Sequence, residues 1–199
     1  ALRRPWHDRY IPTFSHLLID SGAYSVFQSG KKVDAQKMWE WAEQWIDKAD
    51  AIAGLDDILD WRQSLKNYRF GGFPTYHESD PTDASFLDDL IALSRERGNW
   101  LGIGLEPPRS GKLDFVRRTL DRIPPDIHVH GWALREYQCL PKISSVDSTN
   151  WFRYAWTIMS EFPWLTYPEA LEIMVKKYKR EQIHKSDEDV AQLMIGWEE

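Results

Sequence analysis

The chain has little cysteine, no long apolar run and no excess of positive charge, and each of these deficits excludes a class of protein. The single cysteine, Cys139, excludes an internal disulfide and a zinc site built from several cysteines, and it fits a reducing compartment. No apolar run approaches the roughly 18 to 20 residues that a membrane span needs, and no signal peptide is evident. We therefore expect a cytoplasmic protein with no membrane partner.

The charge balance gives no sign of a nucleic-acid-binding surface. The 199 residues carry a formal net charge of −6, and the content of apolar and charged residues is ordinary for a globular protein. Exposed basic helix faces remain as candidate phosphate contacts, although such faces are usually only solvated: Arg117, Arg118 and Arg122 on one helix, and Lys176, Lys177, Lys179 and Arg180 on another.

Six short apolar runs each end in a polar residue or a glycine. They begin near residues 17, 51, 73, 100, 127 and 143, and helical patterns lie between most of them. The carboxyl ends of parallel strands converge on one face of a sheet or barrel, where active sites lie. The pattern therefore predicts an enzyme, with these residues at its site: Asp20, Asp56, Asp57, His77, Gly104, Leu105, His130, Gly131 and Asp147.

The alternation of strands and helices predicts an α/β fold, and within it a TIM-barrel-like parallel barrel. Asp34 and Asp83 are the expected N-caps of two helices, and Gly98 is expected to close the second. Six strands do not close an eight-stranded barrel, so the barrel is incomplete, or its other strands are irregular or precede the first residue. We expect residues 1–150 to form the barrel-type catalytic domain and residues 151–199 a helical C-terminal extension packed on it.

Four segments resemble one enzyme family. Asp20-Ser21-Gly22-Ala23-Tyr24 is similar to the Asp-Ser-Gly-Gly-Phe segment of tRNA-guanine transglycosylases, and Leu101-Gly102-Ile103-Gly104-Leu105 resembles their Ile-Gly-Gly-Leu strand. His128-Val129-His130-Gly131, followed by Ser145-Val146-Asp147-Ser148-Thr149-Asn150-Trp151, resembles the late strands of phage and bacterial relatives. Those relatives are implicated in placing 7-deazaguanines in DNA. The resemblance spans roughly Leu17 to Trp151 and rests on the order and spacing of the segments.

The resemblance implies that the chain exchanges a base on a nucleic acid through a glycosyl-aspartate. Asp147 matches the nucleophile that attacks the sugar C1′ and expels guanine, after which a 7-deazaguanine takes the sugar. Asp20 matches the carboxylate that binds the base and manages its proton. Asp56 or Asp57 matches the acid that reads the guanine edge, and His77 stands where the family has a polar recognition residue. The other substrate contacts expected are Ser21, Gly22, Gly104, Leu105, His130 and Gly131.

The chemistry of base exchange needs two acids. Displacing a nucleobase passes through oxocarbenium-like charge, which an ionised carboxylate stabilises and can trap covalently. A second acid must protonate the leaving base or deprotonate the incoming one. The chain lacks the zinc site of three cysteines and a histidine that the tRNA enzymes carry, which favours DNA over tRNA. We expect no cofactor and no metal. The expected partners are DNA, a free 7-deazaguanine base and a protein that supplies DNA contacts.

Other interpretations stay open. A metal-dependent barrel hydrolase would use histidines and acids at the strand ends as ligands, namely His77, His128, His130, Asp20 and Asp147. An N-glycosidase that releases the base to water would use the same two acids as the transglycosylase. A non-catalytic module that binds nucleic acid or a protein partner is the third alternative. In the simplest case, Asp20 and Asp147 only cap the turns after their strands.

Overall fold

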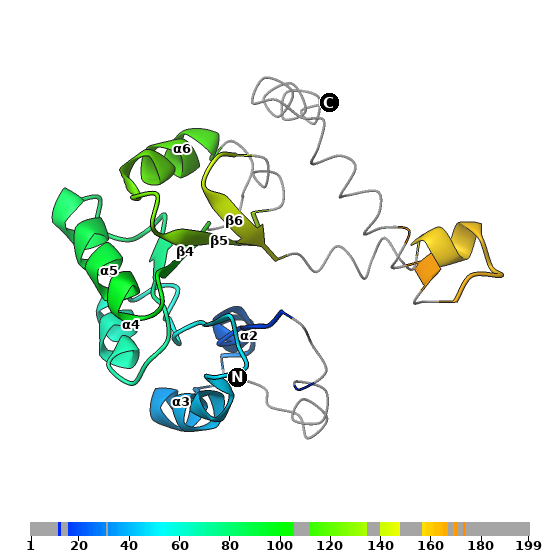
Figure 1. Cartoon of the computed structure of the whole chain (residues 1–199), viewed down its shortest axis with the longest axis horizontal. Coiled ribbons are helices and arrows are strands. Elements are labelled where there is room, and N and C mark those ends of the chain that lie inside the picture. The colour runs from blue at the N-terminus through cyan, green and yellow to red at the C-terminus, as the bar shows by residue number, and fades with distance from the viewer. Residues whose placement is uncertain are drawn as a thin grey trace. The chain divides into compact units, whose positions relative to one another are not determined.

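The computed structural model describes residue 12 and residues 16–30, 32–105, 112–134, 140–147, 157–166, 169–170 and 173. In this part of the chain helices separate the first five of the six strands from one another (Figure 1). Each strand coincides with one of the six apolar runs, so the predicted α/β class is confirmed. The strands are β1 (Leu18–Ile19), β2 (Ala51–Ile52), β3 (Thr75–His77), β4 (Trp100–Gly104), β5 (His128–Trp132) and β6 (Ile143–Val146).

The described helices are α2 (Ala23–Ser29), α3 (Ala35–Ala42), the 3₁₀ helix η2 (Glu43–Trp45), α4 (Trp61–Tyr68), α5 (Ala84–Glu96) and α6 (Leu113–Arg122). Three of them begin at an aspartate whose side chain accepts backbone N–H groups of the first turn: Asp34 for α3, Asp60 for α4 and Asp83 for α5. These caps confirm the predicted helix starts at Asp34 and Asp83. None of the described helices combines the length and apolar character that a membrane span requires.

The first four strands are parallel and follow the order of the chain. β1 pairs with β2, with Ile19 opposite Ile52, and β3 pairs with β4, with His77 opposite Gly104. A single parallel bridge between Ala53 and Phe73 connects the end of β2 to the start of β3. The second sheet continues in the order β3-β4-β5-β6. The residues that follow β1 to β4 therefore leave their strands in the same direction.

The chain divides into two compact units. The first consists of Ala1–Glu106 with Ile123–Val129, and the second of Pro107–Arg122 with His130–Glu199. Strands β1 to β4 belong to the first unit and β6 to the second, while β5 contributes residues to both. Residues 157–161 are helical, and most of the predicted extension, residues 151–199, lies outside the described residues.

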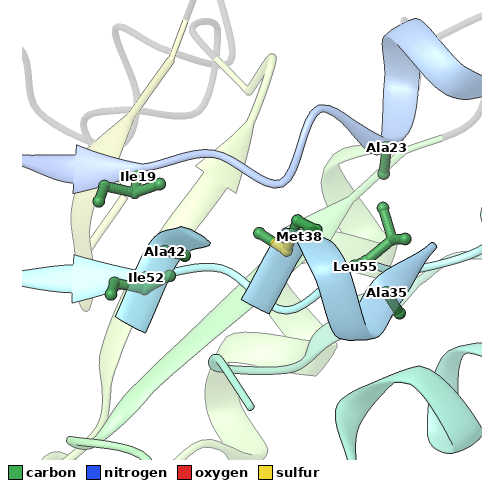
Figure 2. Packing of buried hydrophobic residues seen from close by; sticks show 7 residues of the cluster. All are labelled: Ile19, Ala23, Ala35, Met38, Ala42, Ile52 and Leu55. Carbon is green, nitrogen blue, oxygen red and sulfur yellow. The ribbon is translucent and has the colours of Figure 1, made fainter. Parts of the chain in front are cut away.

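The core of the first unit packs α3 against the β1–β2 pair (Figure 2). Ile19 and Ile52 come from the two strands, and Met38 and Ala42 come from the helix; Ala42 is fully buried. The other members of this buried cluster are Ala23, Ala35 and Leu55. Leu55 lies in the segment that follows β2 and leads to Asp56, so the packing anchors the start of that segment.

Two segments of the first unit touch main chain to main chain. A Cβ atom built on Gly72 would lie 2.3 Å from the nitrogen and 2.6 Å from the Cα of Gly54, and Gly72 has φ of +80°. The N–H of Gly54 donates to the carbonyl of Phe73 at 2.9 Å, and the N–H of Phe73 donates to the carbonyl of Ile52 at 2.8 Å. Residue 72 must be a glycine, because a Cβ atom at this position would overlap the main chain of Gly54.

Candidate active site

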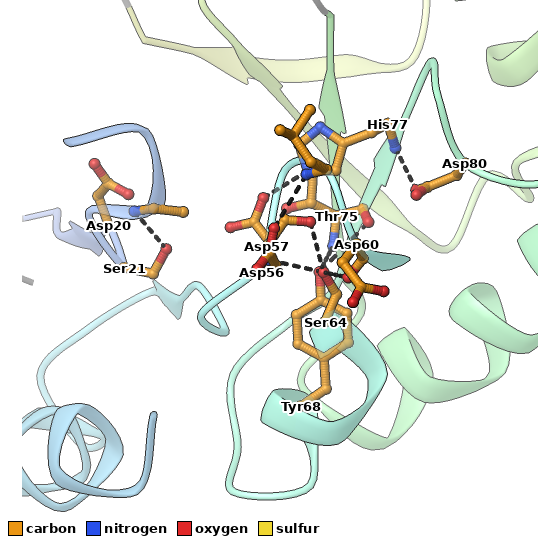
Figure 3. Close-up of polar contacts among 12 residues, drawn as sticks. Asp20, Ser21, Asp56, Asp57, Asp60, Ser64, Tyr68, Thr75, His77 and Asp80 are labelled. Atoms are coloured by element: carbon orange, nitrogen blue, oxygen red, sulfur yellow. Dashed lines mark hydrogen bonds and ion pairs between the residues drawn. The ribbon is translucent and has the colours of Figure 1, made fainter. Parts of the chain in front are cut away.

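The strand ends of the first unit bring Asp56 and His77 into direct contact (Figure 3). Nε2 of His77 lies 2.5 Å from Oδ2 of Asp56, and the two side chains are only 8% and 9% exposed. His77 is the last residue of β3, and Asp56 follows the segment that Leu55 anchors. Ionisable side chains are seldom buried in this way unless they are paired, so the Asp56–His77 pair is a candidate functional site.

His77 is held by its main chain and by the space that a glycine leaves. Its N–H donates to Oδ2 of Asp80 at 2.6 Å, and the N–H of Asp80 donates back to the carbonyl of His77 at 3.1 Å. The imidazole lies over Gly104, where a Cβ atom would be 2.4 Å from Nδ1. Gly104 was predicted to contact the base, and in the structure it makes room for the ring of His77.

Tyr68 and Ser64 of α4 bind the backbone of the two segments that carry this pair. The hydroxyl of Tyr68 is fully buried and accepts the N–H of Thr75 at 3.0 Å, while Oγ of Ser64 accepts the N–H of Asp57 at 2.8 Å. Burial, together with the charge of Asp56, raises the pKa of Tyr68 well above its ordinary value, so the hydroxyl stays protonated. These bonds tie α4 to β3 and to the segment that carries Asp56.

Sequence reasoning missed Ser64, Tyr68 and Asp80. Nothing in a sequence marks a helical serine or tyrosine as the partner of a backbone N–H seven residues away, in a loop for Ser64 and in a strand for Tyr68. The contact of Asp80 could have been predicted from the sequence, because Asp80 lies three residues after His77. A carboxylate at that spacing can reach back to a main-chain N–H, as in a capping box.

Asp57 and Asp20 have exposed side chains that shape turns. Oδ1 of Asp57 accepts the N–H of Leu59 at 3.1 Å, and Oδ1 of Asp20 accepts the N–H of Gly22 at 2.9 Å. Gly22 has φ of +75°, as the predicted tight turn requires, and Ser21 is buried beside it. Figure 3 shows Asp20 and Ser21 to one side of the Asp56–His77 pair. Of the two adjacent aspartates, it is Asp56 whose carboxylate contacts the ring of His77.

The second unit holds Asp147, His130 and Gly131. Asp147 follows β6; its exposed carboxylate accepts the N–H of Ala133, and its own N–H donates to the carbonyl of Gly131 at 3.3 Å. His130 is buried, with Nδ1 2.8 Å from Oγ of Ser145. Ser145 and Asp147 are two residues apart, the spacing that places side chains on one face of a strand. The remaining predicted contact, Leu105, is a buried residue of the first unit.

His130 is uncharged at neutral pH. Burial lowers the pKa of His130 to about 4, although the charge of Asp147 acts in the opposite direction. Within the described part of the chain, Nε2 of His130 is buried without a hydrogen-bond partner. The ring of Trp132 packs edge-on against it, with centroids 4.2 Å apart. A protonated His130 would therefore bury a charge and leave one N–H unpaired.

We expect His130 to make the folded state less stable in mild acid. Well above pH 6.5 the residue is neutral in both the folded and the unfolded chain. As the pH falls from about 6.5 to about 4, the unfolded chain binds the proton first, and the free energy of unfolding drops by on the order of 3 kcal/mol. Urea unfolding at several pH values measures this drop, and it should be smaller in His130→Gln, whose amide can still bond to Ser145. Equal pH dependence in both proteins would contradict the assignment.

The metal-hydrolase interpretation receives no support from the described residues. No group of three or more histidine, cysteine, aspartate or glutamate side chains in the described ranges is placed to hold a metal ion. His128 is exposed and stacks on Trp100, with ring centroids 5.1 Å apart, whereas His130 is buried. The two histidines of the suspected ligand pair therefore have different surroundings.

Comparisons with family models, with curated proteins and with solved structures found no match for this chain. The resemblance to the guanine transglycosylases therefore rests on the segments quoted from the sequence.

Proposed function

We propose that the protein is a base-exchange transglycosylase of barrel type, which replaces guanine in DNA by a 7-deazaguanine through a glycosyl-aspartate on Asp147. The observation that carries the proposal is the buried Asp56–His77 pair at the ends of parallel strands. Asp20, Asp56, His77 and Gly104 follow or end four consecutive strands of the first unit. Parallel strands place such residues at one edge, where substrates bind.

Asp56 is suited to read guanine. The Watson–Crick edge of guanine presents two donors, N1–H and N2–H, and a carboxylate accepts both. The side chain of Asp56 is almost fully buried, so a base that binds to its carboxylate displaces few water molecules from it. A hydrogen bond to a carboxylate is stronger in such surroundings than at an exposed surface.

Asp147 is suited to attack a sugar. Its side chain is exposed, so the C1′ atom of a nucleotide can reach it, and the N–H of Ala133 orients the carboxylate. An ionised carboxylate stabilises the oxocarbenium-like charge of the transition state and traps it as an ester. The incoming base then displaces the carboxylate from C1′ and regenerates the enzyme.

The test is exchange of labelled guanine into double-stranded and single-stranded DNA by the purified full chain, followed on denaturing gels that retain a protein–DNA adduct. Mass spectrometry of nucleosides from the DNA of cells that express the protein identifies the incoming base. Exchange with an adduct supports the proposal. Release of guanine with no re-entry of any base would instead identify an N-glycosidase, and neither exchange nor release in any DNA would end the proposal.

A further inference from the structure

We propose that His77 does not contact the base but positions the carboxylate of Asp56, which then selects a base with two neighbouring N–H donors; this inference rests on the proposed reading of guanine by Asp56. The resemblance instead gives His77 the role of a recognition residue that contacts the base. Asp56, His77, Asp80 and Gly104 all belong to the first unit, and their contacts favour the positioning role.

Both nitrogens of the His77 ring face protein. Nε2 lies 2.5 Å from Oδ2 of Asp56, and because an ionised carboxylate only accepts, Nε2 is the donor of this hydrogen bond. Nδ1 lies on the side of Gly104, since a Cβ atom on that glycine would be 2.4 Å from Nδ1 and 2.6 Å from Cε1. The side chain is only 8% exposed. The ring therefore offers a ligand little surface, while it holds the carboxylate of Asp56.

The backbone of His77 fixes the place of this donor. Its N–H donates to Oδ2 of Asp80 at 2.6 Å, and the N–H of Asp80 donates to the carbonyl of His77 at 3.1 Å (Figure 3). His77 also lies opposite Gly104 in the parallel pairing of β3 and β4. A donor that its own strand and turn hold in place fixes the direction of the acceptor that it binds.

The direction of the Asp56 carboxylate decides which bases it can bind. A carboxylate has about four lone-pair positions, of which His77 takes one, and the others suit the N1–H and N2–H groups of a guanine-type base. A carboxylate that turns away from this direction cannot meet both donors. Because Asp56 is only 9% exposed, an oxygen that lacks its donor is also poorly hydrated, which is costly. A base without the 2-amino group should therefore bind more weakly.

The decisive ligands are 7-deazaguanine and 7-deazahypoxanthine, which differ only in the 2-amino group. Equilibrium dialysis of each free base against the purified full chain, without DNA, measures the two dissociation constants. We expect the wild type to bind 7-deazaguanine about 10- to 100-fold more tightly. In His77→Leu this preference should fall below about threefold, because the carboxylate is free to turn. His77→Gln should restore most of the preference, since its amide N–H can take the place of Nε2.

A double variant shows whether His77 acts through Asp56. Asp56→Asn should itself lose the preference, because an amide presents one acceptor and one donor to the two donors of the base. Adding His77→Leu to Asp56→Asn should then change each dissociation constant less than about twofold, since the group that His77 positions is already gone. A large further loss would mean that His77 has a contact of its own with the base.

The matched control is His16→Leu. His16 forms a histidine–aspartate pair at the surface, with Nδ1 3.5 Å from Oδ2 of Asp50 and side chains that are 88% and 47% exposed. This variant should bind both bases as the wild type does. Gly104→Ala tests the inference with the imidazole present, and it serves if His77→Leu does not fold. Its new Cβ atom would push the ring of His77 from the carboxylate, so it should show the same loss of preference.

Three results would overturn the inference. Equal weakening of both bases in His77→Leu, with the preference kept, would make His77 a direct contact of the base or a structural residue only. Unchanged dissociation constants would give it no role. A wild type that binds neither base, or binds both equally, would show that Asp56 does not read the 2-amino group. Failure of base exchange is distinct, because a chain that shows the preference and its loss but exchanges no base in DNA refutes only the transglycosylase.

Discussion

Asp147→Asn should abolish base exchange, with a loss on the order of 10⁴-fold or more and no covalent adduct on a denaturing gel. An amide oxygen is a poor nucleophile and cannot form the glycosyl ester that the incoming base must displace. The local fold should survive, because the side-chain oxygen of asparagine can still accept the N–H of Ala133. The loss is therefore expected in the chemical step, with DNA binding unchanged.

The control is another exposed aspartate changed in the same way. Asp126 pairs with Arg95 at 3.0 Å, and both side chains are about half exposed, so Asp126→Asn should keep full activity. Labelled-guanine exchange and gel retention of the adduct are measured side by side for the two variants. Full exchange in Asp147→Asn would refute the assignment of Asp147 as the nucleophile. An equal loss of exchange in both variants would show a general effect of charge on DNA binding.

Gly72→Ala should cause the largest loss of stability, on the order of 3 to 5 kcal/mol. The new Cβ would lie 2.3 Å from the nitrogen of Gly54, and this neighbour is backbone, which cannot rotate away as a side chain can. The positive φ of +80° adds strain of about 1 to 2 kcal/mol for any residue with a Cβ. The segment that leads to Asp56 should shift as a result.

Gly98→Ala separates the effect of the clash with neighbouring backbone from the effect of the positive φ. Gly98 has nearly the same conformation, with φ of +85°, but a Cβ atom there would meet nothing within 4 Å. Only the conformational strain applies, so we expect a loss of about 1 to 2 kcal/mol. Midpoints of urea unfolding compare the two variants. If Gly72→Ala is no more destabilised than Gly98→Ala, the close approach of the two main chains is not needed for stability.

The strands and most helices were predictable because their signals are local. Each apolar run became a strand, and Asp34 and Asp83 cap the helices that follow them. Helix α2 had no such signal, since it has seven residues, follows Gly22 and makes no side-chain cap bond. Tertiary contacts rather than a start signal must stabilise a helix of this length.

The candidate site was predictable only as a set of residues at strand ends. Asp56 and His77 are 21 positions apart, and the sequence could not say that they touch. Nor could it choose Asp56 over Asp57, because the direction of each side chain depends on a segment with no regular period. The sequence also could not predict the structural role of Gly104. Its importance to the fold comes from the ring of His77 that lies over it.

The single bridge between Ala53 and Phe73 has a consequence for the dynamics of the site. The hydrogen bonds from Gly54 to Phe73 and from Phe73 to Ile52 join the β1–β2 pair to β3 at this position, and we expect the two sheets to part there at a lower free energy than either sheet unfolds. Asp56 lies three residues beyond Ala53, whereas His77 belongs to β3. Opening at the bridge would therefore move the carboxylate of Asp56 away from the imidazole of His77. Deuterium uptake at the amides of Gly54 and Phe73 would report how often the two side chains separate.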